Sequence, residues 1–345
     1  MAKLKYDYLI VGQGLAGSIL AFLLIQRGQR VMVVDDHQRG AASVVAAGII
    51  NPVTGHRLNI SDGFSRYFPA ARRVYKQLER ELDCRLWYPT AQSRLIKNPG
   101  QLEYLQQRKL DPVYCDVLGH YDETAKGFAL KQFGTVAIEQ TVVVDVADIL
   151  RKMRNWLTDR GSITMSRVDH SSLVNVGNGF SVGGATARRI IFCQGHQATE
   201  NPWLRDLPFK LAKGDVLTID SGESVSKMLN WGRWLVPTPR GTKLGSTFEW
   251  QNLCAAPQDS ARRELLANLK QHTGLEPVVT EHQCGIRPTT RHRKPFVGPI
   301  GGLDQGYCFN GFGSKGCLLM PALAEQLIDH LQHSKPLAHE LTQCL

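Results

Sequence analysis

The sequence lacks any long apolar run, any close pair of cysteines and any internal repeat. No apolar stretch reaches the roughly 18 residues that a membrane-spanning helix needs, so we predict no membrane span. The eight cysteines stand singly, without a CxxC pair, and this predicts neither a metal site nor a dithiol redox centre. A low-complexity linker is also missing, so we expect domains that interleave rather than domains joined by a tether.

Length and composition indicate a globular enzyme. The 345 residues are too many for one compact core of ordinary size, which predicts two domains. Hydrophobic residues make up 43% and charged residues 21%, a balance that argues against disorder. The start, MAKLKYDYLIVGQG, has a basic head, but its apolar part runs into a glycine turn without a cleavage site. We therefore expect a first strand in a cytoplasmic protein.

The charge is basic. Lysine and arginine number 41 against 31 acidic residues, a formal charge of +10. Such a balance is typical of nucleic-acid binding, of an anionic substrate or of a basic surface alone. Because the basic residues are dispersed and form no arginine-rich tail, a solvated basic surface is favoured and a nucleic-acid face is the weaker interpretation.

The N-terminal residues follow the pattern of a dinucleotide-binding fold. An apolar strand at 7–11 leads into the glycine turn 12–17, and a helical pattern ends at Gly28. A second strand, 31–34, then closes on Asp35. The order of strand, glycine turn, helix, strand and acid is more specific than the glycines alone.

Each residue of this motif has a physical task. Gly12 permits the tight turn, Gly14 lets the backbone approach a pyrophosphate, and Gly17 lets the helix pack closely on the strand. Asp35, about 20 residues on, is predicted to accept hydrogen bonds from a ribose diol, with Asp36 as the neighbouring candidate.

The rest of the chain alternates between helical and strand patterns. We predict helices at 68–82, after an N-cap at Asp145, and at 259–272, ended by Gly274. The predicted strands are 162–166, 189–192, 215–219, 234–236 and 243–248, while 84–140 reads as short β-like runs broken by Pro, Gly and Asp. The small residues of 40–48 suggest either backbone against a large flat group or a tight helix-to-loop transition.

Five segments in order resemble the D-amino-acid oxidase family of FAD-dependent oxidoreductases, which includes glycine oxidase and sarcosine oxidase. They are VGQGLAG (11–17) with Asp35, ASVVAAGI (42–49), IIFCQG (190–195), GIRP (285–288) with PFVGP (295–299), and GFGSKG (311–316). The resemblance implies an α/β fold, α+β overall. A glutathione-reductase-type, Rossmann-like FAD domain (1–83, 141–205 and 285–345) would interleave with a smaller substrate domain (84–140 and 206–284) on an antiparallel or mixed sheet.

The family also implies the cofactor and its contacts. FAD is expected to be non-covalent, because Cys284 stands one residue out of place for flavin attachment. Gly313 to Gly316 would lie at the pyrimidine edge of the flavin, where backbone N–H groups suit the negative charge of the reduced ring. The implied cofactor residues are Gly12, Gly14, Leu15, Ala16, Gly17, Asp35, Asp36, Ser43, Ala46, Ala47, Gly48, Ile49, Val168, Gly195, Arg287, Gly311, Gly313, Ser314, Lys315 and Gly316.

Arg287 is the predicted substrate anchor. By the resemblance, its guanidinium would fork onto a substrate carboxylate, a fit that guanidinium geometry favours. The alternative is an arginine that braces the substrate sheet through an ion pair. His56, in the loop after the flavin-side segment, is a second candidate near the pocket. The basic stretch 291–293 departs from the family pattern and suggests an anionic small-molecule substrate.

The implied reaction is oxidation of the C–N bond of a small amino acid or secondary amine, by hydride transfer to flavin N5. No catalytic base is assigned, because a neutral amine needs none. Three alternatives stay open: a flavin enzyme acting on a modified tRNA nucleoside, a flavin dehydrogenase of a 2-hydroxy acid, and a flavin-binding protein without catalysis.

Overall fold

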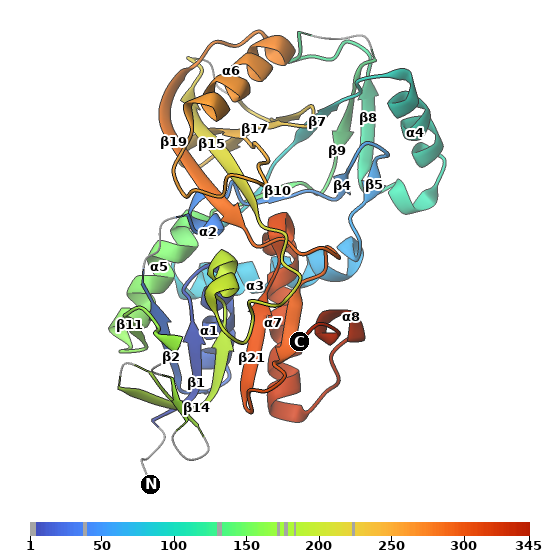
Figure 1. Cartoon of the computed structure of the whole chain (residues 1–345). Helices are drawn as coiled ribbons and strands as arrows, with labels where there is room; N and C mark the ends of the chain where they lie inside the picture. Colours follow the sequence, from blue (N-terminus) through green and yellow to red (C-terminus); the bar gives the residue numbers. More distant parts are fainter. Residues whose placement is uncertain are drawn as a thin grey trace.

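The computed structural model describes residues 5–36, 40–129, 133–170, 173–175, 179–182, 184–222 and 225–345. Two layers are stacked along the long axis of the molecule, and each is built on one large sheet (Figure 1). The chain passes between the layers several times, so the strands of each sheet come from separate stretches of sequence. No helix in this described part is long and apolar enough to cross a membrane.

The first sheet has a parallel centre. Its strands are β1 (Tyr6–Val11), β2 (Val31–Asp35), β11 (Ile163–Met165), β12 (Val174–Asn175), β13 (Phe180–Val182), β14 (Ala185–Phe192), β20 (Phe296–Pro299) and β21 (Gly306–Asn310). The parallel strands lie in the order β11, β2, β1, β14 and β21. Val11 pairs with both Val34 and Phe192, so the carboxyl ends of three strands reach one edge, where ligands of open parallel sheets bind.

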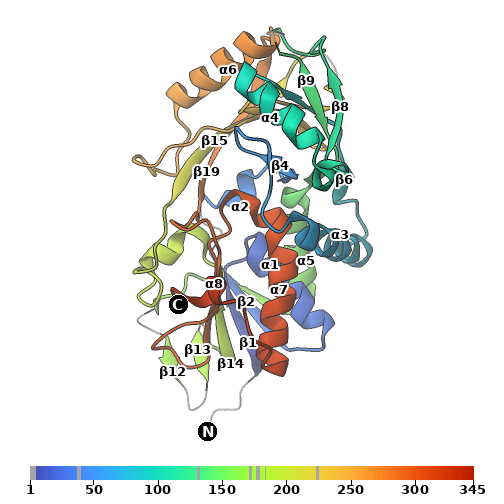
Figure 2. The same ribbon diagram turned by 90° about the vertical axis from the view of Figure 1, so that its right-hand side faces the viewer.

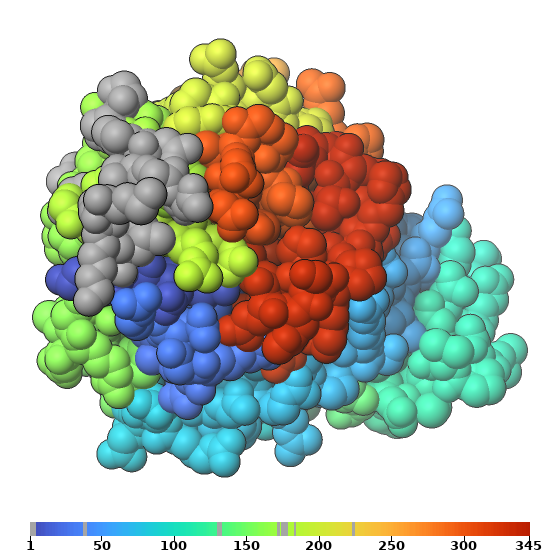
Figure 3. Space-filling model, turned by 90° about the horizontal axis from the view of Figure 1, so that it is seen from below, coloured from blue at the N-terminus to red at the C-terminus, as the bar shows by residue number. Residues whose placement is uncertain are grey.

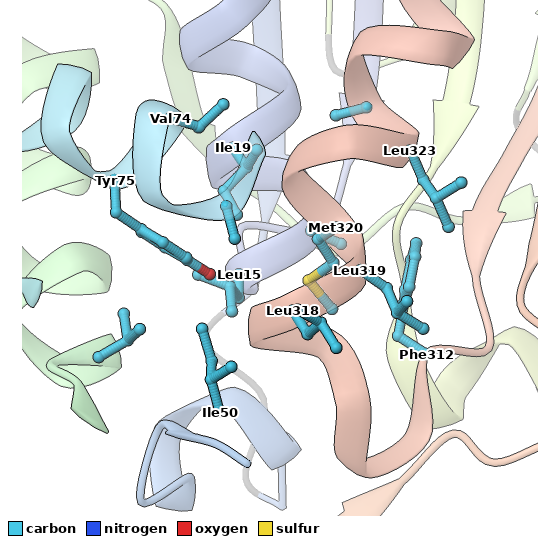
Figure 4. Packing of buried hydrophobic residues seen from close by; sticks show 14 of the residues in the cluster. Leu15, Ile19, Ile50, Val74, Tyr75, Phe312, Leu318, Leu319, Met320 and Leu323 are labelled. Carbon is cyan, nitrogen blue, oxygen red and sulfur yellow. The ribbon is translucent and has the colours of Figure 1, made fainter. Parts of the chain in front are cut away.

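Helices cover this sheet. They are α1 (Leu15–Gln26), α3 (Phe64–Glu81), α5 (Val146–Asp159), α7 (Gly316–His333) and α8 (His339–Thr342). The largely buried α1 packs against both α5 and α7. Side chains of α1, α3 and α7 meet in one apolar cluster, in which Leu15 and Ile19 approach Tyr75 (Figure 4). The Tyr75 hydroxyl donates to the Cys317 carbonyl at 3.0 Å and so ties α3 to the start of α7.

The second sheet is mixed. Its strands are β7 (Gln92–Leu95), β8 (Leu118–Asp122), β9 (Thr135–Ile138), β15 (Ala212–Asp220), β16 (Met228–Asn230), β17 (Trp234–Thr238), β18 (Gly241–Gly245) and β19 (Val278–Arg287). They lie in the order β19, β15, β18, β17, β16, β7, β9 and β8, and only β7 and β16 run parallel in the described pairings. The helix α6 (Asp259–Thr273) packs on this sheet through Leu265 and Leu269. The helix α4 (Pro99–Lys109) belongs to the same layer, and Figure 1 shows it on the opposite side of that layer from α6. In Figure 2 both helices lie at the end of the molecule away from the first sheet.

Short elements join the layers. They are α2 (Ala42–Val45), β3 (Ile49–Ile50), β4 (Val53–Thr54), β5 (Asn59–Ile60), β6 (Trp87–Pro89) and β10 (Val142–Val144). The strand β10 pairs with both β3 and β6, at the level between the two large sheets (Figure 1). Seen from the base, the C-terminal residues lie beside the N-terminal ones, and the teal residues of the other layer project at one side (Figure 3).

Most predicted elements are confirmed, with shifted ends. Asp145 is the N-cap of α5, and its side chain accepts from the Asp148 N–H at 3.0 Å. Gly274, in the left-handed region at φ 77°, ends α6 as predicted. The helix predicted at 68–82 begins earlier, at Phe64, and Pro69 lies inside α3. The division into sequence segments stays a prediction, and β19 spans the predicted boundary at 284–285.

Two predictions were wrong. The stretch 84–140 was expected to hold β-like runs alone, but it contains the helix α4. That helix buries only Gln101 and Leu105, so it has too little apolar periodicity to be recognised. The strand predicted at 243–248 ends at Gly245, and the residues after it turn toward the space between the layers.

Candidate active site

A cavity of about 730 Å³ lies between the two layers. One wall is formed by segments that follow the carboxyl ends of β1, β2, β14 and β21. The opposite wall belongs to the second sheet, with side chains from β7, β16, β17, β15 and β19. A mostly apolar lining with a few charged groups is typical of a cofactor or substrate site.

Most of the predicted cofactor residues line this cavity. They are Gly12, Gly14, Leu15, Ala16, Asp35, Asp36, Ser43, Ala46, Ala47, Gly48, Ile49, Val168, Gly195, Arg287, Gly313, Ser314, Lys315 and Gly316. Gly17 and Gly311 do not line it. A Cβ atom at Gly17 would lie 1.9 Å from the Gly12 carbonyl oxygen, so Gly17 serves close packing of helix on strand. Gly311 packs against Thr290, and a Cβ atom added at Gly311 would lie 2.8 Å from the Thr290 Cγ2 atom.

A buried network holds Asp35 at the edge of the first sheet. Its carboxylate accepts from the Gln13 N–H at 2.9 Å and from the Arg154 guanidinium of α5 at 2.8 Å. Arg154 also donates to the Gln13 side-chain oxygen at 2.8 Å, and the Gln13 amide donates to the Leu150 carbonyl. The position of the Asp35 carboxylate is therefore fixed in part by α5, a link that the glycine motif alone does not reveal.

The segment 42–49 crosses between the layers in close contact with both. The Ser43 hydroxyl accepts from the Leu15 N–H, at the start of α1, at 3.1 Å. Gly48 has φ 72°, and a Cβ there would lie 1.8 Å from the Val144 carbonyl oxygen. Only glycine fits such a backbone approach, so this segment can run flat along the cavity.

Lys243 lies behind this segment and was not predicted. Its ammonium donates to the carbonyls of Val45 and Ala46 at 3.3 and 3.4 Å. The side chain comes from β18, is almost fully buried, and has no carboxylate within ion-pair distance in the described part of the chain. Burial lowers the pKa of Lys243 below its usual value.

The start of α7 faces the cavity from the first layer. Gly313, Ser314 and Lys315 form a short 3₁₀ turn that leads into the helix at Gly316. No side chain caps the helix start, so its N–H groups can face a negative charge. Lys315 is half-buried, and burial lowers the pKa of its ammonium.

Arg287, at the end of β19, is partly buried and forms no ion pair with an acid among the described residues. Its Nη2 donates to the Ser246 hydroxyl at 2.7 Å, while Nη1 has no hydrogen-bond partner among the described residues. The guanidinium lies over the Phe248 ring, 4.5 Å from its centroid. Burial lowers the pKa of Arg287 to about 10. The described part of the chain therefore gives Arg287 no ion pair through which it could brace the sheet.

His56 lies at the mouth of the cavity. Its ring is exposed, with Nε2 3.3 Å from the Asn98 amide and its edge toward Tyr104. Cys284 is buried in β19 but does not line the cavity, in keeping with non-covalent FAD. Among the lining residues that were not singled out as site residues from the sequence are Arg94, Lys97, Trp234 and Phe248.

Comparison with known protein families shows which family the chain belongs to. A family model described as FAD dependent oxidoreductase, the DAO family, matches residues 7–330. The chain belongs to this family. As a DAO-family oxidoreductase it is FAD-dependent. The cavity suits that cofactor, with the carboxylate of Asp35 at one end and the start of α7 at the other.

The chain is similar to proteins with different names. The chain is 23% identical to a glycine oxidase of Bacillus licheniformis, over 94% of this chain and 92% of that protein. It is 21% identical to the tRNA 5-methylaminomethyl-2-thiouridine biosynthesis bifunctional protein MnmC of Vibrio vulnificus, over 93% of this chain but 55% of that protein. The crystal structure of iminodiacetate oxidase from Chelativorans sp. shares the DAO fold with a TM-score of 0.79 and 18% identity, over 97% of this chain and 98% of that one.

Proposed function

We propose that the protein oxidises the C–N bond of a small amino acid or secondary amine whose carboxylate binds Arg287. The observation that carries this proposal is a guanidinium whose buried Nη1 has no hydrogen-bond partner among the described residues and which forms no ion pair with an acid there. A carboxylate would accept from Nη1 and neutralise the charge, which is costly to leave unpaired in an apolar site. Relatives named glycine oxidase support an amino acid as the substrate.

The residues of the cavity orient the substrate. Arg287 would hold the carboxylate, while Trp234 and Met228 give an apolar wall that limits water. The acids that line the cavity in the described chain, Asp35, Asp36 and Glu200, all follow strands of the first sheet, away from Arg287. No acid lines this wall of the cavity in the described chain, so the Arg287 guanidinium would disfavour a charged ammonium and the substrate amine would favour the neutral form that can lose hydride. FAD, held by the residues that line the first-layer wall, would supply the two-electron acceptor for this oxidation.

The test is an anaerobic titration of the FAD-loaded protein with amino and N-methyl amino acids, followed by visible absorbance. Bleaching of the flavin band by one of them supports the proposal. Hydroxy acids are offered in parallel, and bleaching by these alone would replace an amine oxidase with a hydroxy-acid dehydrogenase. No bleaching with either class would favour flavin binding without catalysis.

A modified tRNA nucleoside is the second candidate substrate. Phe248 and Trp250 are exposed and stacked, with ring centroids 6.1 Å apart, and Phe248 lies against Arg287 at the cavity. Exposed aromatic rings beside cationic groups suit unstacked bases. Retention on tRNA that falls steeply with salt would support this candidate, and no retention at low salt would remove it.

A further inference from the structure

The two walls of the cavity differ in their acidic residues. Of the described lining residues, the acids lie where the segments after β2 and β14 meet, at the Asp35 end. The wall formed by the second sheet instead carries Arg94 and Arg287, with Lys97 at its rim, and no acid. A substrate with a single carboxylate bound to Arg287 would leave the charge of Arg94 without an anion.

Arg94, like Arg287, is a cavity-lining arginine that forms no ion pair among the described residues. Its side chain, on β7, is 9% exposed, and its guanidinium donates to the carbonyls of Val53 and Gly55 at 3.1 and 2.6 Å. No carboxylate lies within ion-pair distance of it in the described part of the chain. Burial lowers the pKa of Arg94 to about 10. Two backbone carbonyls occupy two of its five N–H groups and leave its charge without a counter-ion.

The register of the second sheet sets the spacing of the backbone positions that anchor the two cations. Gly245 of β18 pairs with Trp234 of β17, Trp234 with Asn230 of β16, and Asn230 with Arg94 of β7. Ser246, which holds Arg287, directly follows Gly245. Three strand spacings therefore separate the two anchoring points, roughly 14 Å at about 4.8 Å per strand.

The surface between the two arginines is suited to a carbon chain. The Trp234 indole lies over Gly245, where an added Cβ would be 2.6 Å from the ring. Trp234, Met228 and Asn230 all line the cavity along this path. Lys97 lies beyond Arg94 toward solvent, with its ammonium 3.3 Å from where a Cβ of Gly232 would be.

We propose that the substrate is a dianion: an amino acid whose carboxylate binds Arg287 and whose nitrogen or side chain carries a second acidic group, several carbons away, that binds Arg94. The distal group is a carboxylate or a phosphate, since a guanidinium binds either bidentately. This inference rests on the proposed function, because it assigns the rest of the same substrate. The C–N bond would lie over the flavin-side segment between the two anchors.

The experiment uses N-substituted glycines of graded length with the FAD-loaded protein. The series is N-methylglycine, N-(carboxymethyl)glycine, N-(3-carboxypropyl)glycine and N-(5-carboxypentyl)glycine. Each longer acid is compared with the N-alkylglycine that lacks the second acidic group. One phosphonate analogue is also included. We expect kcat/KM of the best carboxyalkyl compound to exceed that of its uncharged match by at least about 30-fold. In Arg94→Gln that ratio should fall toward one, while Arg94→Lys, which keeps the charge, retains part of it. Arg205→Gln removes an exposed guanidinium outside the cavity and should leave the ratio unchanged.

The outcomes separate this inference from the proposed function. If the uncharged N-alkylglycines are oxidised as well as the diacids, the proposal of a dianionic substrate is wrong and amine oxidation still stands. If nothing is oxidised, binding of unreactive dicarboxylates is followed by the shift that they cause in the flavin spectrum. Binding that weakens at least about tenfold in Arg94→Gln keeps the dianion site and removes the oxidase proposal. Neither oxidation nor binding would overturn both. A phosphonate preferred over its carboxylate supports the site with phosphate as the distal group.

Discussion

The guanidinium of Arg287 lies against the α-carbon of Gly214 on the neighbouring strand. A Cβ atom at Gly214 would be 2.1 Å from Nη2 and 2.6 Å from the central guanidinium carbon. Glycine inside a strand normally weakens it, and here it marks the place where a charged group needs the space.

Gly214→Ala should therefore displace the guanidinium without removing its charge. Because the end of a flexible side chain can move, we expect little loss of stability but a rise in KM of about 10- to 100-fold. Steady-state kinetics with the substrate found by flavin bleaching measures this. Gly100→Ala, whose Cβ would have its nearest neighbour at 3.6 Å, is the control. An unchanged KM in Gly214→Ala would show that this position of Arg287 is not used for binding.

Arg287 should contribute more to catalytic efficiency than Ser246, whose hydroxyl accepts its hydrogen bond. Arg287→Ala leaves a substrate carboxylate unpaired in the cavity. We expect a loss of about 2–5 kcal/mol of transition-state stabilisation, which lowers kcat/KM at least about 30-fold. Arg287→Lys keeps the charge but not the fork, so its loss should be intermediate. Ser246→Ala removes one hydrogen bond and should cost about 1 kcal/mol. Equal losses in Ser246→Ala and Arg287→Ala would contradict a direct carboxylate contact.

Arg154 should affect FAD binding although it does not line the cavity. It pairs with Asp35 and with the Gln13 side chain, so Arg154→Met leaves the Asp35 carboxylate without this cation. We expect FAD affinity to fall about tenfold in Arg154→Met and by a similar amount in Asp35→Asn, with less than additive loss in the double variant. Flavin fluorescence during titration of the apoprotein measures all three. Additive losses would mean that the two residues act separately.

Stability should depend on pH through Lys243. Because burial lowers its pKa in the folded protein, the unfolded chain holds this proton up to a higher pH, near the ordinary value of 10.5. Between the two pKa values the unfolded chain therefore binds more protons, and stability rises with pH. The free energy of unfolding of the wild type, relative to Lys243→Met, should increase toward pH 10.5, by about 1.4 kcal/mol for each unit of lowering.

Urea denaturation at a series of pH values from 7 to 10.5 gives this difference. Lys335→Met, which changes an exposed lysine, serves as the matched control. A flat difference for Lys243→Met would mean that its ammonium is solvated in the folded protein.

The nucleotide half of the site could be predicted because its determinants are local. Gly12, Gly14 and Asp35 lie within one strand–helix–strand unit, and their spacing reports the turn directly. Arg94 could not be predicted. Its place in the cavity depends on the parallel pairing of β7 with β16, which lies more than a hundred residues along the chain. Hydrophobic periodicity assigns a strand but carries no information on its neighbour.

The network of Gln13 had no sequence signal either. Its side chain is 3% exposed and joins the glycine turn to α5 through Leu150 and Arg154. A glutamine in a glycine-rich turn looks like a solvent-facing residue, and only the position of α5 makes it part of the core. Non-local contacts of this kind account for most of what the sequence analysis missed.

The row formed by Gly245, Trp234, Asn230 and Arg94 places one position from each of four adjacent strands side by side, and the last three line the cavity. Each strand can therefore exchange its own residue without altering the hydrogen bonds of the sheet or the segments that hold the flavin. Substrate preference in this architecture can drift one strand at a time, while the redox half of the enzyme stays constant. A single scaffold of this type can thus give rise to enzymes for very different amines by small, independent steps.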